Sequence, residues 1–178
     1  RCLKIYIRGV ETLERVFIAL GSNISPRGPR LMATRQMLRG IAAGGWKESA
    51  IYETPPVGPE GQDKYFNQVV SFWYSRGKVR LLNYLKGAEL LLGRKPRGHW
   101  NSREIDLDLL YYGEIVSSGR PTVPHPEVQK RQFVLIPLCD IAPEWKDPLT
   151  GCSLQDMLFE LRRREGDLGF KIVDSEDF

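Results

Sequence analysis

Glu104-Ile-Asp-Leu-Asp-Leu-Leu-Tyr-Tyr112 is an apolar and aromatic segment with a carboxylate at every second position of its first half. Such a run predicts a β-strand. Side chains of a strand alternate between its two faces. One face should therefore carry the carboxylates and the other the aliphatic side chains, that is, Glu104, Asp106 and Asp108 opposite Ile105, Leu107 and Leu109.

Asp106 and Asp108 form a candidate cation site. Their Cα atoms would lie roughly 6–7 Å apart on a strand, and two carboxylates at that spacing can hold one or two hard cations. An isolated Asp-x-Asp pair is more often a solvated strand face. Here the strand is strongly apolar, which places the pair near the core, where carboxylates need cations. Arg103 adds a guanidinium suited to phosphate oxygens, so the segment indicates Mg²⁺-nucleotide chemistry.

The periodicity of the preceding sequence predicts the order strand, helix, strand, strand, helix, strand. The expected strands are residues 16–20, 47–53, 66–74 and 104–112. The first helix should begin near Pro29 and end at Gly44-Gly45. The second has an apolar face and a terminal glycine, formed by Leu81, Leu85, Ala88, Leu92 and Gly93. This order is that of the ferredoxin-like βαββαβ core, so we expect an α+β fold with an antiparallel sheet.

Additional elements are expected outside this core. After the fourth strand come a hairpin around Gly113, a proline-rich turn at 121–126, an apolar stretch at 133–138 interrupted by Pro137, and a helix that Ser153 caps. We expect a single domain over residues 16–164 and an irregular tail over 165–178. In residues 1–15, apolar alternation at Leu3, Ile5 and Ile7 leaves open an edge strand or a disordered extension.

Composition is that of an ordinary globular domain, with 42% hydrophobic and 27% charged residues in 178. No apolar run approaches the ~18 residues that span a membrane, and no signal peptide is evident. The net charge of +4 suits an anionic ligand such as a nucleotide. Cys2, Cys139 and Cys152 lack metal-ligand spacing, which favours free thiols in a reducing compartment, and we expect a cytoplasmic protein.

Other residues could bind a nucleotide or a flat ring. Residues 94–99 form a basic loop with proline and glycine that could close over phosphates. Trp100 could stack on a heterocycle, and Asn67 could read an amide-like ring edge. His125, between two prolines, could contact phosphate. The chain lacks G-x-x-x-x-G-K-[ST] and G-x-G-x-x-G, so a nucleotide site here is neither a P-loop nor a Rossmann site.

Several motifs in one order resemble a known family over about residues 16–160. They are Phe17-Ile-Ala-Leu-Gly-Ser-Asn23, Tyr52-Glu-Thr-Pro-Pro-Val-Gly-Pro59, Tyr65-Phe-Asn67, Arg103-Glu-Ile-Asp-Leu-Asp-Leu109, and Val123-Pro-His125 through Arg131-Gln-Phe133. The chain resembles 6-hydroxymethyl-7,8-dihydropterin pyrophosphokinases of folate biosynthesis. That resemblance implies transfer of pyrophosphate from ATP to the pterin's hydroxymethyl group, release of AMP, and two Mg²⁺ ions.

The resemblance also implies roles for individual residues. The catalytic set is Arg94, Arg103, Asp106 and Asp108, of which Asp106 and Asp108 would bind both Mg²⁺ ions. The residues implied to face ATP are Lys86, Glu89, Arg94, Arg103, Leu109, Arg120, Thr122, His125 and Arg131. The pterin pocket would consist of Thr54, Pro55, Pro56, Val57, Tyr65, Asn67, Trp100 and Phe133, with Tyr65 and Phe133 stacking on the ring.

The fifteen residues before Val16 are not part of the family pattern, and the chain departs from that pattern at two further places. Pro126 stands where tyrosine is common, and the loop from Gly93 to Trp100 is about one residue short, which leaves the roles of Lys95 and Arg97 open. We expect a monomer whose partners are ATP and the pterin, with no nucleic acid or membrane. A non-catalytic ferredoxin-like module that binds small ligands or RNA, and a kinase that moves only the γ-phosphate, are the alternatives. The acidic pair argues against an RNA-binding face.

Overall fold

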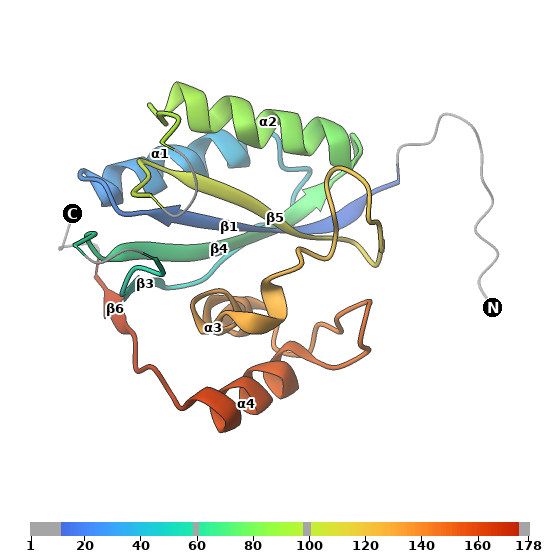
Figure 1. Ribbon diagram of the computed structural model, residues 1–178. Coiled ribbons are helices and arrows are strands. Elements are labelled where there is room, and N and C mark those ends of the chain that lie inside the picture. Colours follow the sequence, from blue (N-terminus) through green and yellow to red (C-terminus); the bar gives the residue numbers. More distant parts are fainter. Residues whose placement is uncertain (1–11, 59–60, 98–100, 175–178) are drawn as a thin grey trace, which may run out of the picture.

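A computed structural model describes residues 12–58, 61–97 and 101–174. It contains a sheet with helices on both faces (Figure 1). The strands are β1 (Glu14–Ser22), β2 (Lys47–Glu48), β3 (Ile51–Thr54), β4 (Tyr65–Tyr74), β5 (Asp106–Tyr112) and β6 (Lys171–Val173). The helices are α1 (Arg27–Arg39), α2 (Lys78–Leu91), the 3₁₀ helix η1 (Val128–Lys130), α3 (Gln132–Ile141) and α4 (Leu154–Glu165).

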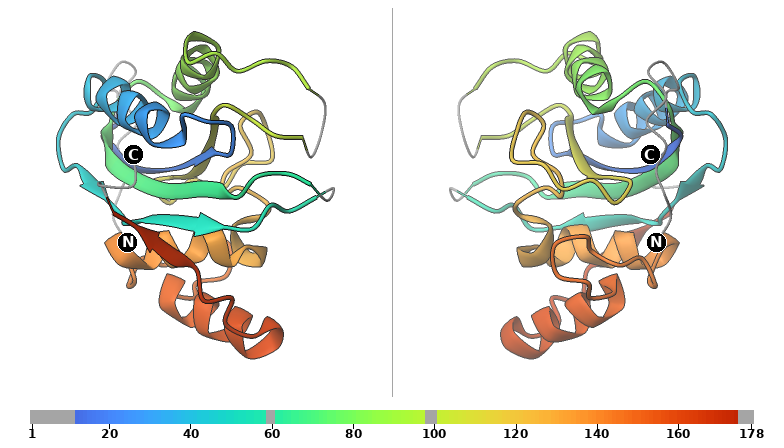
Figure 2. Two further views of the ribbon diagram at one scale, coloured as in Figure 1. Left: turned by 90° about the vertical axis from the view of Figure 1, so that its left-hand side faces the viewer. Right: turned by 90° about the vertical axis from the view of Figure 1, so that its right-hand side faces the viewer.

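The sheet has the order β5-β1-β4-β3-β6, with β2 also paired to β4. All these pairings are antiparallel. Helices α1 and α2 cover one face, α3 covers the other, and α4 lies outside α3, as the two side views in Figure 2 show. The expected α+β fold with an antiparallel sheet is confirmed. Pairing of β1 with both β4 and β5 places the first and last strands of the predicted core side by side.

Alternation along β1 divides the core into two clusters. Val16, Ile18 and Leu20 pack with the leucines of α1 and α2, whereas Phe17 packs with α3 and α4. The side chains of β5 divide in the same way at its start. Leu107 and Leu109, together with Ile105 just before the strand, belong to the cluster under α1 and α2, as the period of two predicts.

A β-bulge changes this alternation in the second half of β5. Phe17 pairs with Tyr111, but the next residue, Ile18, pairs with Leu109, so Leu110 is the extra residue. Leu110 and Tyr111 consequently both pack in the cluster under α3. Without the bulge, Tyr111 would point toward α2. The aromatic end of β5 thus contributes two consecutive side chains to one face.

Several element boundaries differ from the predicted ones. β5 begins at Asp106, so Glu104 precedes the strand, and unlike the two aspartates it does not line the cleft described below. The strand expected over 47–53 is divided into β2 and β3, and α1 ends at Arg39, before the two glycines. Pro137 lies inside α3, where it gives up one helical hydrogen bond without ending the helix.

Expectations for the C-terminal third were partly wrong. In place of a hairpin around Gly113, a bridge joins Ser117 to Val123. Residues 171–173 form β6 beside β3, so the tail is not irregular throughout. The helix after Ser153 is confirmed, because the Ser153 hydroxyl accepts a hydrogen bond from the Asp156 amide. The possible edge strand before residue 12 lies outside the described residues.

Helices that could cross a bilayer are absent from residues 12–58, 61–97 and 101–174, since none there is both long and apolar enough.

Tyr111 connects β5 to the turn before α4. Its hydroxyl donates to Asp147 Oδ2 at 2.9 Å, and both residues are fully buried. Asp147 Oδ1 accepts from the amides of Leu149 and Thr150 at 2.9 Å each. Tyr111 therefore supplies the donor for the second oxygen of a buried carboxylate, and burial together with Asp147 raises the pKa of Tyr111.

We predict that Tyr111→Phe lowers the free energy of unfolding by about 1.5–3 kcal/mol, because it removes a hydrogen bond to a buried charged group. Urea unfolding measures this difference. Tyr84→Phe is the matched control, since the Tyr84 hydroxyl donates to the neutral Met37 carbonyl at 2.8 Å and lies in a less buried place. A loss no greater than that of the control would contradict the assignment.

Candidate functional site

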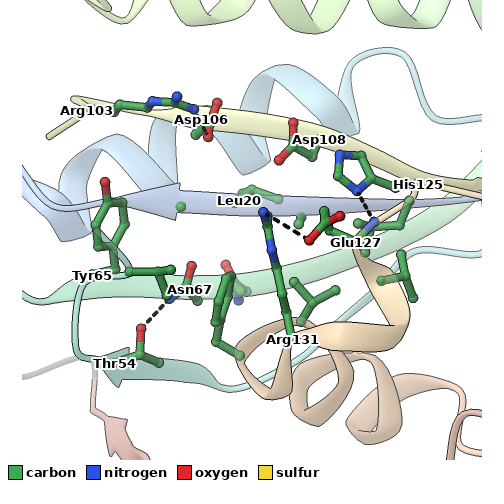
Figure 3. Close-up of a pocket in the computed structure, with 18 of the residues that line it drawn as sticks. Leu20, Thr54, Tyr65, Asn67, Arg103, Asp106, Asp108, His125, Glu127 and Arg131 are labelled. Atoms are coloured by element: carbon green, nitrogen blue, oxygen red, sulfur yellow. Dashed lines mark hydrogen bonds and ion pairs between the residues drawn. The ribbon is translucent and has the colours of Figure 1, made fainter. Parts of the chain in front are cut away.

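A cleft opens on the sheet face that is turned toward α3 (Figure 3). Its floor comes from β1, β4 and β5, and its far wall comes from the segment between residues 125 and 134. The lining residues are Ala19, Leu20, Gly21, Thr54, Pro55, Val57, Tyr65, Asn67, Gln68, Asn101, Arg103, Asp106, Asp108, Leu110, His125, Glu127, Val128, Arg131, Phe133 and Val134.

The cleft exists because side chains on this face of β1 become smaller toward its end. Phe17 is fully buried in the core, Ala19 follows, and Gly21 has no side chain. Gly21 lies between Asn67 on β4 and Asp106 on β5. A Cβ atom at Gly21 would come within 3.2 Å of Asn67 Oδ1. Glycine at this position therefore leaves room for a ligand above the floor.

Asn67 is held in one orientation by Thr54. Its Nδ2 donates to Thr54 Oγ1 at 2.7 Å, and both side chains are buried. Because this bond uses the amide nitrogen, Oδ1 is left facing Gly21 and the cleft as an acceptor. This part of the cleft can therefore accept a hydrogen bond from a ring N–H or an exocyclic amine.

Asp106 and Asp108 both line the cleft, as predicted from their spacing. Asp106 forms ion pairs with Arg94, at 2.5 Å between Nη1 and Oδ1, and with Arg103. Burial opposes ionisation of Asp106, but the charges of Arg103 and Arg94 outweigh it and lower the pKa of this carboxyl. The carboxylate is therefore charged at neutral pH and is surrounded by positive groups.

The donor set suits a hard cation. Mg²⁺ prefers oxygen ligands, and it usually takes one or two carboxylates from the protein and completes its shell with water and nucleotide phosphates. Asp106 and Asp108 supply two carboxylates on one face of β5, and both are partly exposed to the cleft. Within the described ranges, no group of three or more potential protein ligands occurs. The residues present thus fit a cation that phosphate oxygens also bind.

Lys86 and Glu89 of α2 bind the outer edge of β5 behind the aspartates. Glu89 Oε1 accepts from the Leu107 amide at 2.8 Å, and Lys86 Nζ donates to the Leu107 carbonyl at 3.1 Å. Glu89 also pairs with Arg94 at 2.6 Å. Burial raises the pKa of Glu89 in spite of these partners. Neither α2 residue lines the cleft, and the two also pair with each other at 2.7 Å.

Arg103 is positioned by the end of β1. Its amide donates to Asn23 Oδ1 at 2.7 Å, and its carbonyl accepts from the Asn23 amide at 3.1 Å. The Asn23 side chain is fully buried and also donates to Ser102 Oγ at 3.1 Å. Asn23 thus holds this segment through two hydrogen bonds with the Arg103 backbone and one with the Ser102 side chain.

His125 and Arg131 line the opposite wall with Phe133. The His125 amide donates to the Leu110 carbonyl at 2.8 Å, which attaches this wall to the bulge of β5. His125 Nδ1 accepts from the Glu127 amide at 3.2 Å, so Nε2 carries the ring proton and is the donor. Arg131 lies 3.8 Å from Glu127, and its guanidinium carbon lies 5.7 Å from the centre of the Phe133 ring.

Arg97 forms a bidentate ion pair with Glu104. Its Nη1 and Nη2 lie 2.7 Å and 2.6 Å from the two carboxylate oxygens. The hydrogen bond from Arg97 holds the pKa of Glu104 at about 2. Neither residue lines the cleft.

Most of the predicted site residues meet in the cleft. Those that line it are Thr54, Pro55, Val57, Tyr65, Asn67, Arg103, Asp106, Asp108, His125, Arg131 and Phe133. Those that do not are Pro56, Lys86, Glu89, Arg94, Leu109, Arg120 and Thr122. Leu109 packs in the core, and Arg120 and Thr122 lie on an exposed loop. Trp100 lies outside the described residues.

Sequence reasoning missed several lining residues. Gly21 and Ala19 gave a usable signal, because they continue the period of two from Phe17 with shrinking side chains. Asn101, Glu127, Val128 and Val134 gave none, because their places depend on how the segments before and after β5 fold over the sheet.

Comparisons with known proteins agree on one family. A family model described as 7,8-dihydro-6-hydroxymethylpterin-pyrophosphokinase (HPPK) matches residues 17–143. The chain is similar to the 2-amino-4-hydroxy-6-hydroxymethyldihydropteridine pyrophosphokinase of Synechocystis, with 36% identity over 145 residues that cover 79% of this chain and 73% of the relative. The Bacillus subtilis protein of the same name is 38% identical over 139 residues, which cover 77% and 83%.

Two larger proteins are also similar. A mitochondrial folate synthesis bifunctional protein of Arabidopsis thaliana is 39% identical over 135 residues, and the match covers 74% of this chain and 24% of that protein. The crystal structure of wild-type Plasmodium falciparum HPPK-DHPS with pteroate matches with a TM-score of 0.69 and 12% identity. This match covers 90% of the chain and 47% of the solved chain, and at that identity it shows the fold alone.

We predict that Asn23→Ala releases the backbone before β5, because it removes the acceptor of the Arg103 amide and leaves buried groups unpaired at a cost of about 1–3 kcal/mol. The substitution should speed up hydrogen exchange at the Arg103 amide, and it should leave exchange at amides in the centre of β4 nearly unchanged. Asn83→Ala, on the exposed face of α2, is the control. Unchanged protection at Arg103 would show that Asn23 does not position it.

Proposed function

The chain belongs to the 7,8-dihydro-6-hydroxymethylpterin-pyrophosphokinase family, and we propose that it transfers pyrophosphate from ATP to 6-hydroxymethyl-7,8-dihydropterin in folate biosynthesis. One observation carries the proposal. A single cleft combines an acidic pair, Asp106 and Asp108, with guanidinium groups and with a small amide-lined recess. Such a cleft suits a polyphosphate with its cations at one end and a flat heterocycle at the other.

The recess above Gly21 would hold the pterin. Asn67 Oδ1, oriented by Thr54, would accept hydrogen bonds from the ring's N–H and amino groups. Tyr65 and Phe133 would flank the ring, since aromatic faces stack well on flat heterocycles. Pro55 and Val57 would close the apolar side. Pro56 and Trp100 complete the proposed pterin set.

The acidic and basic end would hold ATP. Asp106 and Asp108 would hold two Mg²⁺ ions, which when bound neutralise phosphate charge and bring the attacking and leaving oxygens together. Arg103, Arg131 and His125 point into the same space (Figure 3) and would donate to phosphate oxygens. Further ATP contacts are proposed for Lys86, Glu89, Arg94, Leu109, Arg120 and Thr122.

The proposed reaction forms a bond between the pterin hydroxymethyl oxygen and the β-phosphorus of ATP. The bond from that phosphorus to the oxygen bridging it to the α-phosphorus breaks, AMP leaves, and the hydroxyl proton is released. Arg94 and Arg103 now pair with Asp106 and would transfer to the phosphate oxygens as negative charge shifts there. Asn67 and the aromatic pair hold the hydroxymethyl group in line, which lowers the entropic part of the barrier.

The nucleotide product tests this proposal. The protein is incubated with ATP, Mg²⁺ and the reduced hydroxymethylpterin, and the products are separated by ion-exchange chromatography. We expect AMP and the pterin diphosphate in equal amounts. ADP as the product would mean a kinase that moves only the γ-phosphate, and lack of turnover would favour a module that only binds.

Asp106→Ala and Asp108→Ala should each lower turnover by about 100-fold or more, because loss of a cation ligand removes several kcal/mol of charge stabilisation. The control is Asp167→Ala, whose side chain is 57% exposed near the end of α4. Circular dichroism should show the same fold in all three variants. Near-normal turnover of either cleft variant would refute the cation assignment.

We predict that Gly21→Val acts selectively on the pterin. The valine side chain would fill the recess beside Asn67. Such crowding typically costs about 1–3 kcal/mol, so we expect the KM for the pterin to rise by about tenfold. The KM for ATP should change by less than about threefold. Gly87→Val on α2, where a side chain meets open space, is the control. Equal effects on both substrates would argue against this placement of the pterin.

A further inference from the structure

We propose that Glu104 is a positioning residue for the transfer reaction, which holds the basic loop of residues 94–97 at the cleft through its ion pair with Arg97. This inference rests on the proposed function for its catalytic consequence. The contact itself can be tested without turnover. It also gives a role to Arg97, which the shortened loop had left open.

The contact is specific in its geometry. The two guanidinium nitrogens of Arg97 meet the two oxygens of Glu104 at 2.7 Å and 2.6 Å. Glu104 Oε2 also accepts from the Lys95 amide at 3.3 Å. A parallel pair of charge-assisted bonds fixes the direction of both side chains, and a single lysine contact would not do so. Glu104 therefore binds both the side chain and the backbone of the loop.

Glu104 is rigidly held on its own side. Its side chain is only 6% exposed, and its carbonyl accepts from Ser22 Oγ at 2.6 Å in a buried place. The preceding residue, Arg103, is fixed by Asn23. The carboxylate that binds the loop is thus attached to the end of β1 and to the start of β5. A buried carboxylate without its cation is costly, so the pairing with Arg97 is strongly favoured.

The other end of the loop carries Arg94. Its guanidinium contacts Asp106 at 2.5 Å and Glu89 at 2.6 Å. Arg94 and Arg97 are three residues apart, and Pro96 between them restricts the backbone. Fixing Arg97 on Glu104 therefore limits where Arg94 can go. Glu104 would keep Arg94 within reach of the acidic pair and of the phosphates bound there.

A role of Arg97 as a direct phosphate ligand would predict a different effect of removing the Glu104 charge. If Arg97 were itself a phosphate ligand, Glu104 would compete with ATP for it. Removing the Glu104 charge would then strengthen ATP binding. If Glu104 positions the loop, removing its charge should lower kcat and leave the KM for ATP nearly unchanged.

The test compares Glu104→Gln, Arg97→Ala and the double variant in the full chain. Misplacement of a catalytic group by about 1 Å can cost up to 100-fold. We expect kcat to fall by roughly tenfold in each single variant and by no more in the double variant, because all three break the same contact. Hydrogen exchange at the Lys95 amide should become faster in all three.

Glu160→Gln is the matched control, because Glu160 also pairs with an arginine, Arg163 at 2.8 Å, but lies exposed on α4. The double variant leaves no unpaired buried charge, and it serves if either single variant does not fold. Tighter ATP binding in Glu104→Gln, additive losses, or unchanged Lys95 exchange would overturn the proposal. If the wild type lacks pyrophosphate transfer, the exchange measurement still tests the contact and the proposed function alone fails.

Discussion

The position of β5 at the edge of the sheet is the constraint on which the site depends. One edge of β5 pairs with β1, and none of the strands that the structure describes pairs with the backbone N–H and C=O groups of its other edge. Lys86 and Glu89 of α2 bind the Leu107 carbonyl and amide there, between the two aspartates. Helix α2 thereby fixes the strand that carries the acidic pair, and Glu89 extends the same contacts to Arg94.

The sequence was sufficient to predict the main elements because their signals are local. The period of two in 104–112 predicted that Asp106 and Asp108 share a face, and the leucine spacing in 81–92 predicted α2. The bulge at Leu110 depends on the register with β1, which no local pattern encodes. β6 was missed for a related reason, since its three residues become a strand only beside β3.

Charge in the cleft is arranged before any ligand binds. Asp106 is half-buried, and its ionised form is maintained by Arg103 and Arg94 against the cost of desolvation. The same guanidinium groups are the ones that phosphate oxygens would attract. Phosphate binding would therefore replace the ion pairs between Asp106 and the two arginines by ion pairs between the arginines and phosphate oxygens. The arginines would keep an anionic partner throughout. Charged groups that are already in place need little rearrangement when the reaction takes place.

The decreasing side-chain size along β1 has a consequence for how such a cleft can change. Phe17 is buried in the core, whereas Ala19 and Gly21 line the cleft, so side-chain size at alternate β1 positions helps to set the room above the sheet. A family of related binding sites with different ligand lengths could therefore arise by substitution at alternate β1 positions alone, while the strand pairing that supports the fold is conserved.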